Sequence, residues 1–78
     1  MGIIYVNYGT DFTILAQGGY KNMLKYFSAA LDELYALANY MGGTLVLAYL
    51  NEEAWNLYLK DESSLIDKNA VLQEEVIS

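Results

Sequence analysis

Two pairs of glycines, Gly18-Gly19 and Gly42-Gly43, enclose the most regular segment of the chain. Between them, apolar residues recur at alternating spacings of three and four, which is the period of an α-helix with one buried face. The pattern predicts one long amphipathic helix over residues 21–41, with Gly42 as its left-handed cap. The stripe consists of Leu24, Phe27, Leu31, Leu34, Ala38 and Met41.

The same stripe could serve as a coiled-coil seam between copies of the chain. Coiled coils usually flank their seam with charged residues, whereas Met23, Ala30 and Leu37 widen this stripe with further apolar positions. A broad apolar face is more typical of a helix that covers a sheet. We therefore expect the helix to form part of an intramolecular core.

Segments of strand character stand on both sides of the predicted helix. Residues 3–8 are β-branched and aromatic, and residues 12–17 alternate, so residues 1–17 are expected to form a hairpin around the turn at Gly9-Thr10-Asp11. The turn has no Asn-Gly pair, which leaves the register open. Residues 44–50 are apolar throughout, as in a strand that is covered on both faces.

The acidic segment 52–78 is expected to be helical. Asn51 followed by Glu52-Glu53 is typical of a helix start. The alternation of apolar and polar residues over 54–60 also fits a strand, but the residue propensities favour a helix. Ser64, with Asp67 three residues later, resembles a capping box and predicts a last short helix through Val76.

Together these elements predict a single α+β domain over residues 1–78. Its small antiparallel sheet, an amino-terminal hairpin plus a third strand, would pack on the long helix, and the carboxy-terminal region would be helical. A chain of 78 residues buries only about 60% of its unfolded surface. We therefore expect a homodimer, formed through strand edges or a tyrosine-bearing face.

The side-chain inventory excludes much chemistry. The chain has no His, Cys, Pro or Arg, which removes disulfides, thiolate and imidazole metal ligands, and Cys or His nucleophiles. The sequence therefore predicts no catalytic residue, no cofactor and no metal site.

Two local patterns have structural interpretations that we prefer. Gly18-Gly19-Tyr20-Lys21 could form an anion nest, but it lacks the spacing of a phosphate-binding loop and more simply separates a strand from a helix. Adjacent carboxylates do not face each other on a helix and fit helix starts or solvated faces. Four such pairs occur, Asp32-Glu33, Glu52-Glu53, Asp61-Glu62 and Glu74-Glu75.

The charge is negative and unevenly distributed. The net charge is −6, of which residues 1–50 contribute −1 and residues 51–78 contribute −5. Such a chain is repelled by phosphates and anionic membranes, so direct binding to nucleic acid or to a membrane is not expected. The natural partner is another protein with a basic surface. The amino-terminal residues predict neither a signal peptide nor a lipid anchor, and a cytoplasmic location is the expectation.

These observations favour a non-catalytic interaction module. Its predicted partner-binding residues are the acids Glu52, Glu53, Asp61, Glu62 and Asp67, the aromatic anchors Trp55 and Tyr58, and the helix tyrosines Tyr26 and Tyr40. The tyrosines could equally be scattered exposed residues.

By size and charge alone, small acidic phage proteins of the anti-CRISPR and antirestriction types offer an analogy. They suggest a viral inhibitor that occupies a nucleic-acid-binding groove. The alternatives are a self-assembling structural subunit, and a small-ligand binder or enzyme that uses carboxylates and tyrosines.

Overall fold

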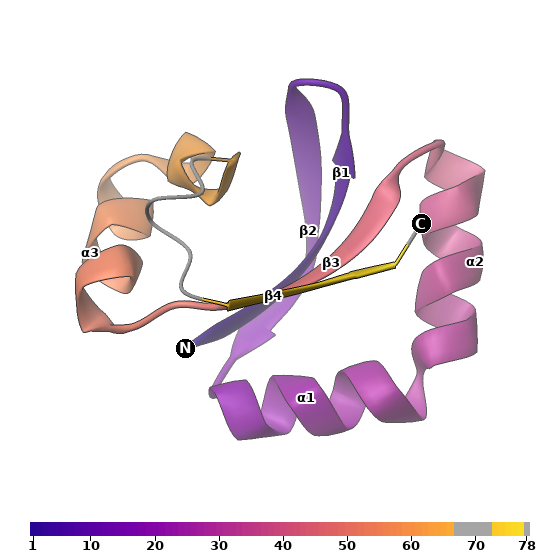
Figure 1. Cartoon of the computed structure of the whole chain (residues 1–78), viewed down its shortest axis with the longest axis horizontal. Helices are drawn as coiled ribbons and strands as arrows, with labels where there is room; N and C mark the ends of the chain where they lie inside the picture. Colours follow the sequence, from indigo (N-terminus) through magenta and orange to yellow (C-terminus); the bar gives the residue numbers. More distant parts are fainter. Residues whose placement is uncertain (67–72, 78) are drawn as a thin grey trace.

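The chain folds as an α+β protein around a four-stranded antiparallel sheet with strand order β2-β1-β3-β4 (Figure 1). The computed structural model describes residues 1–66 and 73–77, with only the backbone at 66 and 73–77. None of the helices in these ranges is long and apolar enough to cross a bilayer.

The amino-terminal hairpin confirms the sequence prediction. Strands β1 (Gly2–Tyr8) and β2 (Asp11–Gly18) pair through a tight turn in which Gly9 has φ 65°. The register, which the sequence left open, places Tyr8 opposite Asp11 and shifts once along the pair. Leu15 is the extra residue at this bulge, because Ile14 and Ala16 face consecutive residues of β1.

The sheet has four strands, where the sequence predicted three. Strand β3 (Thr44–Tyr49) pairs with β1 on one side and with β4 (Gln73–Ile77) on the other. The predicted last helix does not continue through Val76, since residues 73–77 extend beside β3. Asp67 lies outside the described residues.

The predicted single helix is two helices, α1 (Tyr20–Ala29) and α2 (Leu31–Met41). Ala30, with φ −108° and ψ 20°, leaves the helical conformation, and the chain turns a corner there (Figure 1). A straight helix of this length would run past the sheet, whereas the corner lets α1 pack on β1 and α2 pack on β3. Gly42 has φ 75° and caps α2 as expected.

The apolar stripe faces the sheet, as expected for an intramolecular core. Phe27, Leu34 and Ala38 are buried against one face of β1 and β3. Leu31 and Met41 pack at the margin of this cluster, while Leu24 remains 42% exposed.

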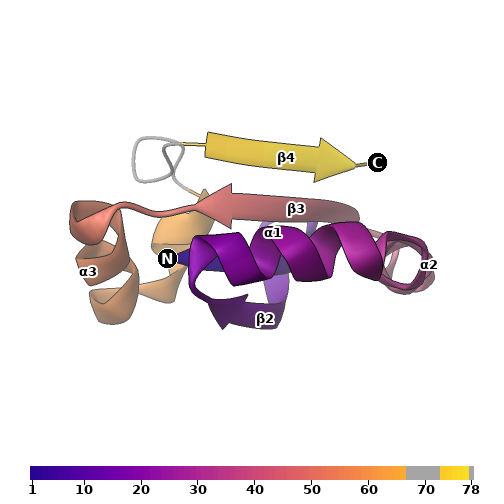
Figure 2. The same ribbon diagram turned by 90° about the horizontal axis from the view of Figure 1, so that it is seen from below.

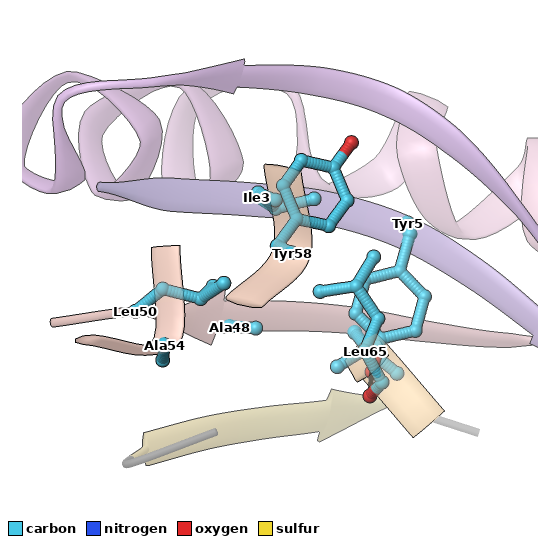
Figure 3. Packing of buried hydrophobic residues seen from close by; sticks show 8 residues of the cluster. Ile3, Tyr5, Ala48, Leu50, Ala54, Tyr58 and Leu65 are labelled. Carbon is cyan, nitrogen blue, oxygen red and sulfur yellow. Dashed lines mark hydrogen bonds between the residues drawn. The ribbon is translucent and has the colours of Figure 1, made fainter. Parts of the chain in front are cut away.

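The opposite face of the sheet is covered by α3 (Glu52–Lys60) and the short 3-10 helix η1 (Glu62–Ile66). In Figure 3, Tyr58 of α3 lies over Ile3, and Leu65 of η1 lies beside Tyr5. The Tyr5 hydroxyl donates to the Leu65 carbonyl oxygen over 3.3 Å, which ties η1 to the sheet. The sheet thus has one core on each face.

The molecule measures 31 × 27 × 15 Å, and the strands stack side by side along its shortest dimension. Figure 2 shows β4 at one side of this slab and β2 at the other, with α1, α2 and α3 arranged around them. The two edge strands therefore lie on the two broad faces.

Candidate functional site

Helix α3 begins where the sequence predicted, because Asn51 caps it. The Ala54 amide donates to Asn51 Oδ1 over 2.8 Å, which satisfies one of the free donors of the first turn. Glu52 and Glu53 follow in that turn and Lys60 lies in the last turn. Both placements are favourable for the helix dipole.

The inner side of α3 takes Tyr58 out of the predicted surface. Ala54 and Tyr58, one helical turn apart, are buried in the core, and Tyr58 is only 5% exposed. The Tyr58 hydroxyl donates to Gln17 Oε1 over 3.2 Å, so its polar end is satisfied inside the protein. Tyr58 therefore supports the surface from beneath and is not a contact residue.

Trp55 is half-buried between the core and solvent. Its ring stacks on that of Tyr58 with centroids 5.3 Å apart and an angle of 29° between the planes. One side of the indole is thereby held against the core. Its exposed part remains available as the aromatic anchor that the sequence predicted.

The outer side of α3 combines acidic and apolar side chains. Helical spacing places Glu52, Trp55 and Leu59 along one flank, and Glu53, Leu57 and Lys60 along the other. Leu59 is 63% exposed and Leu57 is 43% exposed. We call this region the α3 surface and define it as Glu52, Glu53, Trp55, Leu57, Leu59, Asp61 and Glu62.

The carboxyl end of the α3 surface is organised by Asp61. The Ser63 hydroxyl and the Ser63 backbone amide both donate to Asp61 Oδ1, over 2.7 and 3.0 Å. These two hydrogen bonds, the hydroxyl first, lower the pKa of Asp61 and keep it charged. Glu62 is exposed beside it, and burial followed by the Glu62 charge raises the pKa of Tyr58.

Shallow depressions run along α3. One is lined by Met1, Leu50 and Trp55 together with Asn51 and Glu52. Others follow the outer side and are lined by Asn51, Glu52, Glu53 and Asn56, and by Glu53, Asn56, Leu57 and Lys60. Their shared lining residues make one grooved surface, which can receive side chains of another macromolecule.

Tyr26 and Tyr40 belong to a different part of the molecule. They are 46% and 90% exposed on α1 and α2, the helices that cover the other face of the sheet. The structure therefore does not bring them together with the α3 surface.

The other sequence features have structural roles. Gly18 and Gly19 connect β2 to α1, and Asp32-Glu33 occupy the first turn of α2. Ser64, expected as a helix cap, lies inside η1, and its Oγ has no hydrogen-bond partner in the described structure. Among the described residues, no group of three or more acidic side chains is placed to hold a metal ion.

No protein-family model, curated protein or solved structure matches this chain. Inference about function therefore rests on the surface itself.

Leu57 and Leu59 are the site residues that sequence reasoning missed. In a strand, both would share one buried side with Trp55, whereas the helix buries Ala54 and Tyr58 and leaves both leucines exposed. A helix that starts at the Asn51 cap predicts that some of these leucines are exposed, because no single helix face can bury all the apolar residues of 54–59.

Proposed function

We propose that this chain is a non-catalytic protein-binding module and that its α3 surface docks on a basic surface of another protein. The observation that carries the proposal is the exposure of Leu57 and Leu59 among four carboxylates on α3 and the start of η1. Exposed apolar side chains rimmed by charge are characteristic of protein interfaces. The carboxylates would orient the partner, and the leucines and Trp55 would supply contact area.

The partner chemistry that fits best is a nucleic-acid-binding groove. Such grooves gather cations to neutralise phosphates, and an acidic helix with apolar flanks can occupy one in place of nucleic acid. In this form of the proposal the chain acts as an inhibitor. The net charge of −6 supports it, since opposite potentials accelerate encounter.

The test compares two matched pairs of substitutions in the full chain. Glu52→Gln with Glu53→Gln neutralises the first turn of α3, and Asp32→Asn with Glu33→Gln neutralises the first turn of α2. Both variants lose two negative charges from the first turn of a helix, so their costs in helix stability are comparable.

Each variant is used as bait in a host lysate, and the retained proteins are quantified. We expect the α3 pair to lose the partner, the α2 pair to keep it, and salt of about 0.5–1 M to release it. Release by added duplex DNA would support the inhibitor form. A partner retained equally by both variants, or one that resists high salt, contradicts the proposal.

Trp55 offers a second readout, because it is the only tryptophan in the chain. Its emission reports on the α3 surface, where the indole is half-exposed. Addition of the purified partner should shift this emission. An unchanged spectrum on binding would place the contact elsewhere.

A further inference from the structure

The two edges of the sheet differ in how well they resist pairing with another strand. β2 and β4 are the edge strands, and an edge strand offers its outer backbone groups to any strand that approaches. β4 contains the consecutive residues Glu74 and Glu75, and charges on an edge strand are a protection against such pairing. β2 has no charged residue from Phe12 to Gln17.

The outward direction of the β2 backbone follows from one hydrogen bond. The Phe12 amide donates to Asp11 Oδ1 over 2.9 Å and therefore does not bond to β1. In an antiparallel ladder this direction alternates with each residue. Two residues further along, the Ile14 amide also points away from β1, and the described structure places no strand beyond β2 to accept its hydrogen.

The side chains of β2 leave both cores open at this edge. Phe12 and Ile14 pack at the margin of the core under α3, whereas Leu15 and Ala16 pack at the margin of the core under α1 and α2. All four are only half-buried. A strand added beside β2 would cover the rims of both cores at once.

The shape of the molecule gives this edge room for an interface. β2 lies on a broad face of the slab, measuring 31 × 27 Å between Cα atoms (Figure 2). A stable interface buries about 800 Å² on each partner, and a face of these dimensions is of that order.

We infer that β2 pairs with β2 of a second copy in antiparallel fashion, about a two-fold axis perpendicular to the sheet. The result is an eight-stranded sheet in which each core adjoins its counterpart. A two-fold interface requires a surface that complements itself. An uncharged strand that pairs with its own copy in antiparallel fashion meets this requirement, because no like charges lie opposite each other. The same pairing through β4 would bring four glutamates together.

Two measurements on the unaltered chain test this inference. Sedimentation velocity at micromolar concentration should give twice the chain mass. Hydrogen exchange should show protection of the Ile14 amide that increases with protein concentration, since this donor gains an acceptor only in the dimer. A monomer at these concentrations overturns the inference, and so does a dimer in which the Ile14 amide stays unprotected.

A substitution with a matched control locates the interface. Thr13→Lys puts a charge into β2, and Thr10→Lys puts the same charge into the exposed hairpin turn. Thr13→Lys should weaken the dimer about tenfold or more, because each copy brings a lysine into the strand pair. Thr10→Lys should leave the dimer unchanged, and equal effects of the two substitutions contradict β2 pairing.

The dimer and the α3 surface can fail independently. Neutralising Glu52 and Glu53 should leave the dimer intact, and Thr13→Lys should leave partner capture by α3 intact. Salt separates them too, because screening weakens an acidic contact with a basic partner but favours association of two chains of charge −6.

Discussion

Gly43 occupies a position where even a methyl group does not fit. A Cβ placed there would lie 2.5 Å from Val6 Cγ1 and 2.8 Å from the Asn7 carbonyl oxygen. The carbonyl belongs to the β1 backbone and cannot move aside without disturbing the sheet. Gly43→Ala should therefore lower the free energy of unfolding by about 1–3 kcal/mol, measured by urea denaturation.

Its neighbour Gly42 provides the control. A Cβ at Gly42 meets nothing within 4 Å, but the residue has φ 75°. Gly42→Ala should cost about 1 kcal/mol through backbone strain alone. A Gly43→Ala variant no less stable than Gly42→Ala would show that β1 yields to the added methyl group.

Tyr58 should make stability depend on pH at the alkaline end. Burial, and then the Glu62 charge, raise its pKa above the ordinary value of 10.0, so the fold favours the neutral phenol. The contribution of Tyr58 to the free energy of unfolding is complete below pH 10.0, and it is lost as the pH rises through the raised pKa. Unfolding by urea below and above this range should show a smaller alkaline loss in Tyr58→Phe than in the unaltered chain.

Tyr40→Phe is the matched control for this pH dependence. Tyr40 is 90% exposed, and the substitution should preserve the alkaline loss. If Tyr58→Phe shows the same alkaline loss as Tyr40→Phe, ionisation of other groups accounts for it.

At the scale of elements, helix α3 depends on its Asn51 cap. Removing the hydrogen bond to the Ala54 amide by Asn51→Ala should cost about 1 kcal/mol of stability. Asn51→Asp keeps an acceptor in the same place and should cost less. Thermal unfolding followed by circular dichroism measures both, and equal losses would mean that the cap does not stabilise α3.

The elements that the sequence predicted correctly are those with local signals. The hairpin follows from alternation around Gly9, the end of α2 from Gly42, and the start of α3 from Asn51. The corner at Ala30 has no such signal, because alanine is a good helix former and the apolar stripe continues across it. The break instead accompanies the packing of α1 and α2 on different strands of the sheet, which is a tertiary property.

Strand β4 was missed for a similar reason. Residues 73–77 belong to the acidic segment 52–78 and have no pattern of their own that excludes a helix. Their conformation comes from pairing with β3, in which Val46 lies opposite Val76. The apolar residues of 44–50 predicted a strand covered on both faces, but coverage of the faces does not indicate which segment pairs with the edge of the strand.

In the candidate site, the predicted acids Glu52, Glu53, Asp61 and Glu62 are exposed, and Asp67 lies outside the described residues. The sequence prediction misplaced one of the two aromatic anchors, Tyr58, because the rotation of α3 decides whether Tyr58 or Leu57 faces solvent. That rotation is set by the sheet beneath, where Gln17 Oε1 accepts a hydrogen bond from the Tyr58 hydroxyl.

At the scale of the whole molecule, both cores share the same two central strands. Ile3 and Tyr5 of β1 face one core, and Ile4 and Val6 face the other. Loss of either core removes support from the strands that the other core needs. The molecule should therefore unfold as a single cooperative unit, as small domains usually do.

Leu65→Ala in the core under α3 and Leu34→Ala in the core under α1 and α2 test this cooperativity. Each should cost about 2–5 kcal/mol, a large part of the stability of a small domain, and Tyr40→Ala at the surface should cost little. Trp55 fluorescence reports on one face, while far-ultraviolet circular dichroism reports on the whole backbone. Their urea midpoints should coincide and shift together in both core variants, whereas a Trp55 transition that moves only with Leu65→Ala would mean that the faces unfold separately.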